Sequence, residues 1–522
     1  MSFLYDNAVT ISVAAVCCTF AWVFGGTIPS ALMPAIPWLL ALMLEMALCF
    51  PQRHAGESTP EARERVWSAM KRDPMTWLVA AFLLILLIPF FNKGLCPCCD
   101  YPEIHFDGMP EKPPVPFAPF CVNRLEHLTV CVWFFPALIG TLVVRHALLK
   151  RGKRALLEMI VWNGVALGAL GIIQHVTGAK APFWTDYGGD SVYFFSTFGY
   201  PNMAADYFTT LFALSVALWR WKVFAVESRI SESGGEERAK ANRKVFWSKH
   251  AMLIPAAMFF FCAMMTLSRA AILFCSTLAV VFYIHALASF LKKMSQSVRV
   301  KAVAVNLFLV VLIAAFFAVF LSNRDTIALR SRQAGDMDIR AELRREASNI
   351  GGRGLFDRAA GQGSCAAPVA VRIWLKNPLF GCGGWGYRHF LIPNMTDAEY
   401  ARGCGGPGSA NVHNDYLQFL AEHGFVGVVL LGLVFCMLLS PVLKVWRAIV
   451  RSVRFMKPAD QPPRPVAIFA LPASAFCILL GALATIVHAT GDCPLRSPAV
   501  LSLFYVSLAC VDGFMPRLKT SK

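Results

Sequence analysis

Charged residues are scarce in this chain of 522 residues. Only 16% are Asp, Glu, Lys or Arg, against roughly 25% in a soluble domain, whereas 57% are hydrophobic and the mean hydropathy is +0.54. Charges are missing above all from repeated apolar blocks of about 18 to 24 residues, the length that a helix needs to cross roughly 30 Å of hydrocarbon. The composition therefore excludes a soluble multidomain protein and predicts an all-α integral membrane protein.

Signals for removal of the N-terminal block are also missing. The first apolar block, residues 8–24, has no basic segment before it, and no small-residue cleavage pattern follows it. We therefore expect no removable signal peptide and count this block as the first span. The sequence predicts about twelve spans, near residues 8–24, 28–50, 75–92, 127–145, 155–176, 200–219, 251–268, 270–291, 302–322, 425–443, 466–488 and 497–514.

Basic residues are rare in the short loops on one side of these spans. The chain has 49 Lys and Arg against 32 Asp and Glu, a net charge of +17, which by itself could indicate a nucleic-acid partner. Most basic residues instead fall in the alternate loops, as the positive-inside rule describes. These loops are residues 51–73, 145–154, 220–250, 292–301, 444–464 and 516–522. We expect both termini in the cytoplasm, contacts of the basic loop ends with anionic membrane lipids, and no nucleic-acid partner.

One long segment breaks this asymmetry. Residues 323–412 separate the ninth and tenth predicted spans and carry many arginines, although we expect them outside the cytoplasm. Such a length exceeds what a connector needs and is typical of functional segments. Its first half reads as polar helix, whereas its second half contains "RIWLKNPLFGCGGWGYRHF", an amphipathic stretch that should break at Pro378 and then turn on glycines. The arginines could be solvated surface residues or could grip a phosphate. We divide the chain into spans one to nine (1–322), a large, partly helical periplasmic loop with the candidate motif (323–424), and the last three spans with the tail (425–522).

The first outer loop, residues 92–126, contains four cysteines. In an oxidising compartment the default expectation for them is disulfide formation, and a metal site with Asp100 or His105 is the alternative, although the spacing fits no standard zinc knuckle. The cysteines are Cys96, Cys98, Cys99 and Cys121.

The sequence "NVHNDYLQFLAEHGFVG" precedes the tenth span. Asn414 or Asp415 can cap a short helix, and Gly424 can end it. His413 then stands at the mouth of this helix on the outer surface. A histidine there could take a proton from a hydroxyl at neutral pH, or it could be a surface or capping residue.

The segment "HNDYLQFLAEHGFVG" resembles the His-Asn-x-x-Leu signature, with its two later glycines, of the O-antigen ligase and polymerase family. Four further segments resemble family segments in the same order. They are "FGYPNMAADY" (198–207), with Tyr200 where Asn is usual; "TLSRAAIL" (266–273); "IWLKNPLFGCGGWGY" (373–387), with Asn377 where His is common; and "HATGDCPLRSPA" (488–499). The resemblance covers residues 198–514, and the His-Asn motif is its most specific part.

The resemblance implies a metal-independent glycosyltransferase of the bacterial inner membrane. Its donor would be a polyprenyl-pyrophosphate-linked glycan, its acceptor a glycan, lipid or protein, and it would need no cofactor. By the same resemblance His413 is the catalytic base within its His413-Asn414 motif, Arg269 holds the donor pyrophosphate, and Asp492 orients His413 or an arginine. Arg269 could otherwise snorkel to headgroups, and Asp492 could be a helix cap. A second donor-binding arginine comes from the outer loop, where Arg372 and Arg358 are favoured over Arg388.

Two other functions fit twelve spans with cytoplasmic termini. A secondary transporter would place polar sites near the midplane and show repeated halves, but the sequence has no internal repeat and its polar features gather at the outer face. An assembly subunit of an envelope complex would need none of the Arg and His placements.

Overall fold

The computed structural model describes residues 2–23, 25, 35–93, 113–185, 194–232, 250–291, 366–401, 411–454 and 471–515. Over these ranges the chain forms helices and loops and no strand, which confirms the all-α prediction. The helices are α1 (Ser2–Trp22), α3 (Ala35–Cys49), α4 (Thr59–Arg72), α5 (Pro74–Leu87), α6 (Arg124–Ala147), α7 (Lys150–Val176), α8 (Pro201–Glu232), α10 (Leu253–Met265), α11 (Arg269–Leu291), α15 (Ala366–Lys376), α16 (Tyr387–Phe390), α17 (Asp397–Ala401), α18 (Asp415–Arg454), α19 (Ala473–His488) and α20 (Pro498–Cys510). Short 3-10 helices include η4 (Ile392–Asn394), η7 (Pro494–Arg496) and η8 (Val511–Phe514).

Apolar helices occur at every predicted span within the described ranges. Among the described residues, five helices, namely α6, α7, α8, α11 and α18, contain stretches long and apolar enough to cross a membrane, and the bent pair α4 and α5 would make a sixth. Five shorter apolar helices, α1, α3, α10, α19 and α20, fall at other predicted spans. The span predicted at 302–322 lies outside the described residues, so the number twelve stays a prediction.

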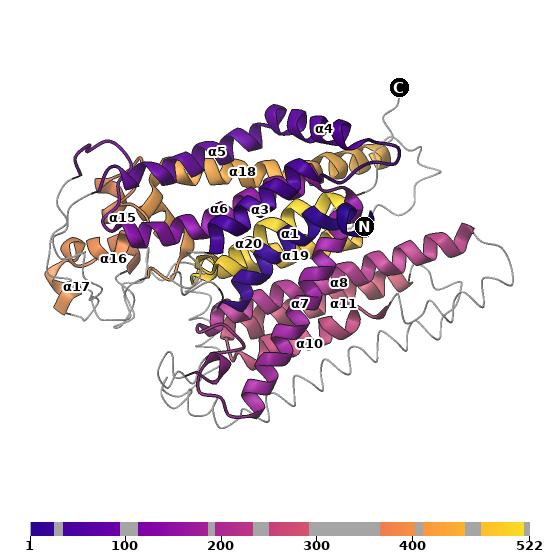
Figure 1. The fold of residues 1–522 in the computed structure, drawn as a ribbon. Coiled ribbons are helices and arrows are strands. Elements are labelled where there is room, and N and C mark those ends of the chain that lie inside the picture. Colours follow the sequence, from indigo (N-terminus) through magenta and orange to yellow (C-terminus); the bar gives the residue numbers. More distant parts are fainter. Residues whose placement is uncertain are drawn as a thin grey trace.

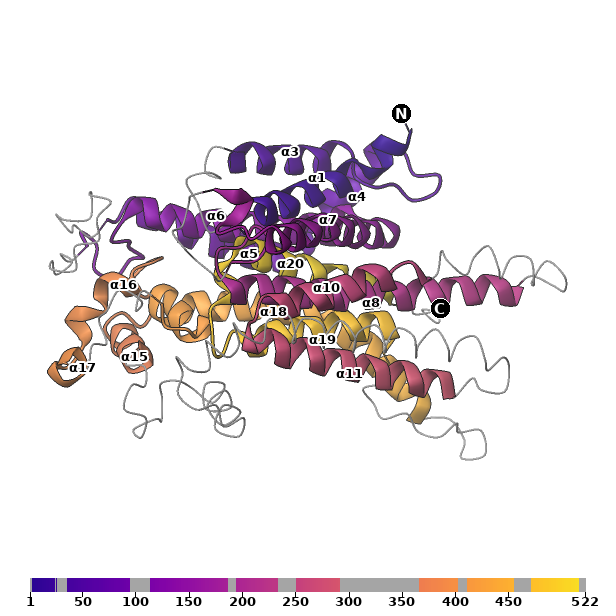
Figure 2. The same ribbon diagram turned by 90° about the horizontal axis from the view of Figure 1, so that it is seen from below.

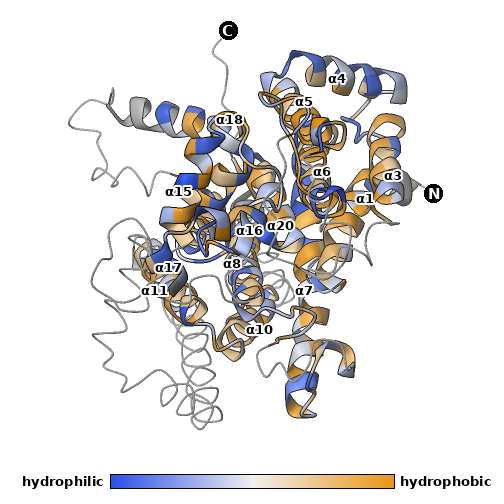
Figure 3. Ribbon diagram, turned by 90° about the vertical axis from the view of Figure 1, so that its left-hand side faces the viewer, coloured by the Kyte–Doolittle hydropathy of each residue, from blue (hydrophilic) through white to orange (hydrophobic). Residues whose placement is uncertain are grey.

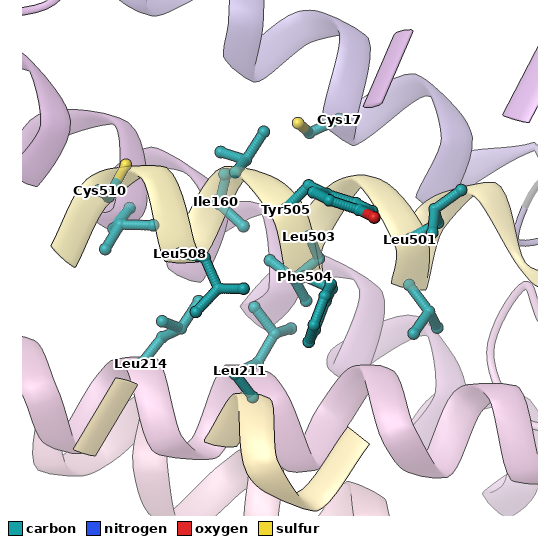
Figure 4. Close-up of a cluster of buried hydrophobic side chains, with 14 of the residues drawn as sticks. Cys17, Ile160, Leu211, Leu214, Leu501, Leu503, Phe504, Tyr505, Leu508 and Cys510 are labelled. Carbon is teal, nitrogen blue, oxygen red and sulfur yellow. The ribbon is translucent and has the colours of Figure 1, made fainter. Parts of the chain in front are cut away.

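The long helices run side by side as a bundle, and α15, α16 and α17 lie beyond one of its ends (Figures 1 and 2). Helix α20 is buried along its whole length and contacts α1, α6, α7, α8 and α19. Figure 4 shows side chains of α20 meeting Cys17 of α1, Ile160 of α7 and Leu211 of α8. Its sequence "PAVLSLFYVSLAC" is apolar all round, which is the pattern of a helix enclosed by others.

Helix α4 corrects the sequence analysis, which treated residues 51–73 as a loop. Ser58 precedes the helix, and its backbone N–H donates to a carboxylate oxygen of Glu61 at 2.8 Å, as in a capping box. Ala62 and Val66 face the protein, while most other side chains are polar. Figure 3 shows α4 largely in hydrophilic colours beside the more hydrophobic α5 and α6. The helix was not predicted because most of its residues are polar or charged, as suits a helix that packs on the outside of the bundle.

The two ends of the bundle carry different partners. At the first turn of α6, Glu126 pairs with Arg388 of the 366–401 segment. Near the other end of α6, Arg145 pairs with Asp73 at 2.5 Å. The 366–401 segment and the turn between α4 and α5 thus lie near opposite ends of α6. Which of these ends faces the cytoplasm stays a prediction.

Of the four cysteines expected to form disulfides, only Cys121 lies within the described ranges. It is a free, buried thiol that donates to the carbonyl oxygen of Pro89 at 3.2 Å. The disulfide expectation is therefore wrong for Cys121, because its sulfur is enclosed at the end of α5 and α6. Cys96, Cys98 and Cys99, together with Asp100 and His105, lie outside the described residues.

Candidate functional site

The His413 turn is fixed by its neighbour Asn414. The Asn414 Oδ1 accepts from the backbone N–H of Leu417 at 3.0 Å, which makes Asn414 the cap of α18. Its amide nitrogen donates to the Thr490 carbonyl at 2.9 Å. His413 itself has φ of +53°, a left-handed conformation that is uncommon for residues other than glycine. The turn therefore joins the start of α18 to the loop after α19 and holds one imidazole in a set direction.

The imidazole of His413 faces Asp492. The distance from Nδ1 to the nearer carboxylate oxygen is 3.0 Å, and the His413 side chain is 35% exposed while that of Asp492 is 8% exposed. Four other donors converge on the same carboxylate: the Tyr200 hydroxyl, the Asn202 amide, and the backbone N–H and the thiol of Cys493. Five donors around one buried acid are the arrangement that stabilises its ionised form.

The charge of Asp492 follows from these contacts. Burial alone raises the pKa of the Asp492 carboxyl, but the hydrogen bonds from His413 and Asn202 and the neighbouring His488 outweigh burial and hold that pKa well below its usual range. Because an ionised carboxylate only accepts hydrogen bonds, Nδ1 of His413 carries a proton. The lone pair of the neutral ring is then on Nε2, the atom that can accept a proton from a substrate.

The glycine-rich segment after α15 packs directly against the break in α18. The break is at Gly424, with φ of +65°, which confirms that the short helix ends there. A Cβ on Gly424 would lie 2.3 Å from the Leu379 carbonyl oxygen, and one on Gly381 would lie 2.4 Å from the Glu422 backbone. Helix α15 ends ahead of Pro378, and Gly381 and Gly383 have positive φ, as predicted. The close approach of the two backbones explains why glycine is needed on both sides.

A chain of hydrogen-bonded buried side chains leads to the His413 turn, and the sequence analysis did not foresee it. Arg496 of η7 pairs with Glu422 at 2.6 Å, Glu422 accepts from the Gln418 amide at 3.1 Å, and the Gln418 oxygen accepts from the Val412 backbone N–H at 3.0 Å. All three side chains lie in the interior, and Arg496 also stacks over Trp385 with its central carbon 4.6 Å from the ring centroid. These contacts connect Arg496 in η7 to Val412, the residue before His413.

A second His–Asp pair lies deeper in the bundle. Nδ1 of His488 is 3.1 Å from Asp206 of α8, and the Thr485 hydroxyl donates to the same carboxylate at 2.8 Å. Both members are nearly fully buried. Ionisable residues within spans usually mark function, and the acidic residue in "NMAADY" was the available signal.

The structure places Arg269 at the end of the bundle that carries His413. Arg269 is exposed and begins α11, directly after a turn in which Leu267 has φ of +53°. Phe274, one and a half turns further along α11, contacts His488 at the last residue of α19, with 5.7 Å between ring centroids. Since Asp492 follows His488 by four residues, Arg269 and the His413–Asp492 pair share one end of the molecule.

The outer-loop arginines have partners within the protein. Arg372 pairs with Glu399 at 2.5 Å and donates to the Asn394 carbonyl at 2.8 Å. Arg388 pairs with Glu126 and stacks over Trp385. Arg372 thus holds parts of the 366–401 segment together, and Arg388 joins this segment to α6. Arg358 lies outside the described residues, and a donor-binding role for Arg372 or Arg358 stays a prediction.

Three groups at this site could hold a metal ion. The ligand atoms of His413, Asp492 and Cys493 all lie within 4.8 Å of one another. None of these three residues was expected to bind a metal, because His413 is far in sequence from Asp492 and Cys493.

Comparison with known proteins supports the family expected from the sequence. Residues 254–432 match the family model described as O-antigen ligase, a range that includes Arg269 and His413 and ends ahead of Asp492. No curated protein matches the chain. The match confirms the resemblance to this family, and the apolar helices agree with a membrane protein.

Proposed function

Taking the O-antigen ligase family as the premise, we propose that this membrane protein transfers a glycan from polyprenyl pyrophosphate to an acceptor hydroxyl on the periplasmic face of the inner membrane. The reaction needs no metal or cofactor and inverts the anomeric centre. The observation that carries the proposal is the 3.0 Å contact between Nδ1 of His413 and Asp492, which leaves Nε2 available as a base on a partly exposed ring.

His413 acts as general base. The acceptor oxygen attacks the anomeric carbon while its proton moves to Nε2 of His413. A carbon–oxygen bond forms, the bond to the phosphate oxygen breaks, and the electron pair leaves with the pyrophosphate. Asp492 keeps the Nδ1 proton in place and stabilises the imidazolium that forms, while Asn414 holds the turn.

Arg269 binds the leaving group. Pyrophosphate departs readily once its charge is stabilised, and a guanidinium matches phosphate oxygens bidentately and stays charged. The exposed start of α11 leaves this side chain at the end of the bundle where His413 lies. A second arginine completes the donor site. Arg358 is the better of the two expected residues, because Arg372 already pairs with Glu399.

A transport function has one observation in its favour, the Asp206–His488 pair buried between α8 and α19. His488 of this pair precedes Asp492 by four residues, however, and Asp492 is the residue that contacts His413. A glycosyltransferase accounts for the His413–Asp492 pair and Arg269, and His488 of the second pair helps to lower the pKa of the Asp492 carboxyl. We favour it for that reason.

The test uses purified protein in liposomes with a lipid-linked glycan and, in separate reactions, a glycan, a lipid and a protein acceptor. We expect transfer to one acceptor class, unchanged by EDTA and lost in His413→Ala. His175→Ala is the matched control, because His175 is an exposed histidine near the end of α7. Uptake of solute without transfer, or EDTA-sensitive transfer that magnesium or manganese restores, would contradict the proposal.

A further inference from the structure

The groups around His413 include a thiol that the proposed reaction does not use. Cys493 follows Asp492, is buried, and its sulfur lies 3.5 Å from the carboxylate oxygen that His413 contacts at 3.0 Å. An imidazole nitrogen, a carboxylate oxygen and a sulfur thus converge from the start of α18 and the loop after α19.

This set of atoms matches the preferences of zinc. Zn²⁺ takes nitrogen, oxygen and sulfur ligands at roughly 2.0–2.3 Å in a tetrahedron, which requires ligand atoms about 3.3–3.8 Å apart. Two of the three separations are 3.0 and 3.5 Å, and all three are within 4.8 Å, so small side-chain rotations suffice. The His413 ring is 35% exposed, which leaves a route from outside and a fourth position for water.

We propose that His413, Asp492 and Cys493 form a Zn²⁺ site on the outer end of the bundle, and that zinc bound there switches off glycan transfer. The inhibitory effect rests on the proposed function, whereas the binding site does not.

The switch follows from the two nitrogens of one ring. In the active arrangement Nδ1 carries the proton and Nε2 carries the lone pair. A metal on Nδ1 needs the lone pair there, so the ring proton must be on Nε2, and a protonated Nε2 cannot accept the acceptor's proton. The thiol proton of Cys493 passes to water as the thiolate binds, and Asp492 turns from His413 to the metal. Zinc binding and base catalysis are therefore mutually exclusive.

The inhibition test compares wild type with Cys493→Ser across a series of Zn²⁺ concentrations. Serine keeps a hydrogen-bonding group beside Asp492 but is a poor zinc ligand, so the effect of Zn²⁺ on each protein is measured relative to that protein's own rate without metal. We expect reversible inhibition of the wild type, relieved by EDTA, and an increase of about tenfold or more in the half-inhibiting Zn²⁺ concentration for the variant. Cys436→Ser, at an exposed cysteine of α18, should behave as the wild type. Equal zinc sensitivity of the wild type and Cys493→Ser would overturn the site.

A binding measurement separates the two proposals. Co²⁺ replaces Zn²⁺ and gives a thiolate-to-metal charge-transfer absorption, so the wild type should show a band that Cys493→Ser lacks and Cys436→Ser keeps. The band in a protein that transfers no glycan would refute the proposed function and leave the metal site standing. Glycan transfer without that difference in absorption would refute the metal site alone.

Discussion

Replacing Asp492 by asparagine changes the charge at the site but hardly its shape. In the structure the carboxylate accepts from five donors, which belong to His413, Tyr200, Asn202 and, through its N–H and its thiol, Cys493. An asparagine offers one acceptor oxygen and an NH2 group, so at least one donor must face another donor. The substitution should affect His413 most, because the negative charge of Asp492 keeps the ring proton on Nδ1.

The magnitude follows from the hydrogen bond that is lost. A hydrogen bond to a charged group contributes about 1.5–3 kcal/mol, which equals roughly 10- to 150-fold in rate if the whole contribution is felt in the transition state. If the amide also reverses the His413 tautomer, the loss should approach about 10,000-fold, as for the corresponding change in a serine protease triad. We expect turnover of Asp492→Asn to fall between these bounds.

The assay is glycan transfer by purified variants in liposomes, with thermal unfolding measured on the same samples. Asp397→Asn, at an exposed residue of α17, serves as the control for the same chemical change. An Asp492→Asn protein with wild-type turnover would refute the claim that the carboxylate sets the His413 tautomer. So would an equal loss in Asp397→Asn.

Three further predictions concern separate parts of the chain. Arg269→Lys keeps the charge but loses the bidentate fork, so the KM for the donor should rise while the unfolding temperature stays; an unchanged KM would remove Arg269 from the donor site. Arg496→Met leaves Glu422 buried and unpaired, so the free energy of unfolding should fall by about 3–5 kcal/mol and be partly recovered by adding Glu422→Gln, whereas a fully stable single variant would contradict this. A reporter enzyme fused after Gly363 should be active only outside the cytoplasm, and activity inside would reverse the topology.

Local features of the chain were predictable because their causes are local. The cap at Asn414, the helix end at Gly424 and the break at Pro378 depend on the conformations that Asn, Gly and Pro favour, and the structure has each of them. Apolar blocks likewise predict helices wherever the structure describes them. Helix α4 was missed because a helix lying on the bundle needs only a narrow apolar stripe, here Ala62 and Val66.

Contacts between distant segments were harder to foresee. The role of Asp492 came from family resemblance, and two interpretations, orienting residue and helix cap, stayed open. The contact with His413 supports the first, whereas Cys493 is the residue that precedes η7 and this short helix has no side-chain cap. The Arg496–Glu422 pair had no local signal, because the two residues are far apart in sequence and a charged residue that will be buried looks the same as an exposed one. Cys493 had no local signal either, and only the fold brings it to His413.

The most direct test of the central claim is the turnover of His413→Asn. Asparagine tolerates the left-handed backbone at this position and is itself a good capping residue, so the turn and the unfolding temperature should be preserved. It has no group that can take the acceptor's proton at neutral pH. We predict that turnover falls by on the order of 100- to 10,000-fold. Near wild-type transfer by a folded His413→Asn protein would show that His413 supports the turn and that another residue is the base.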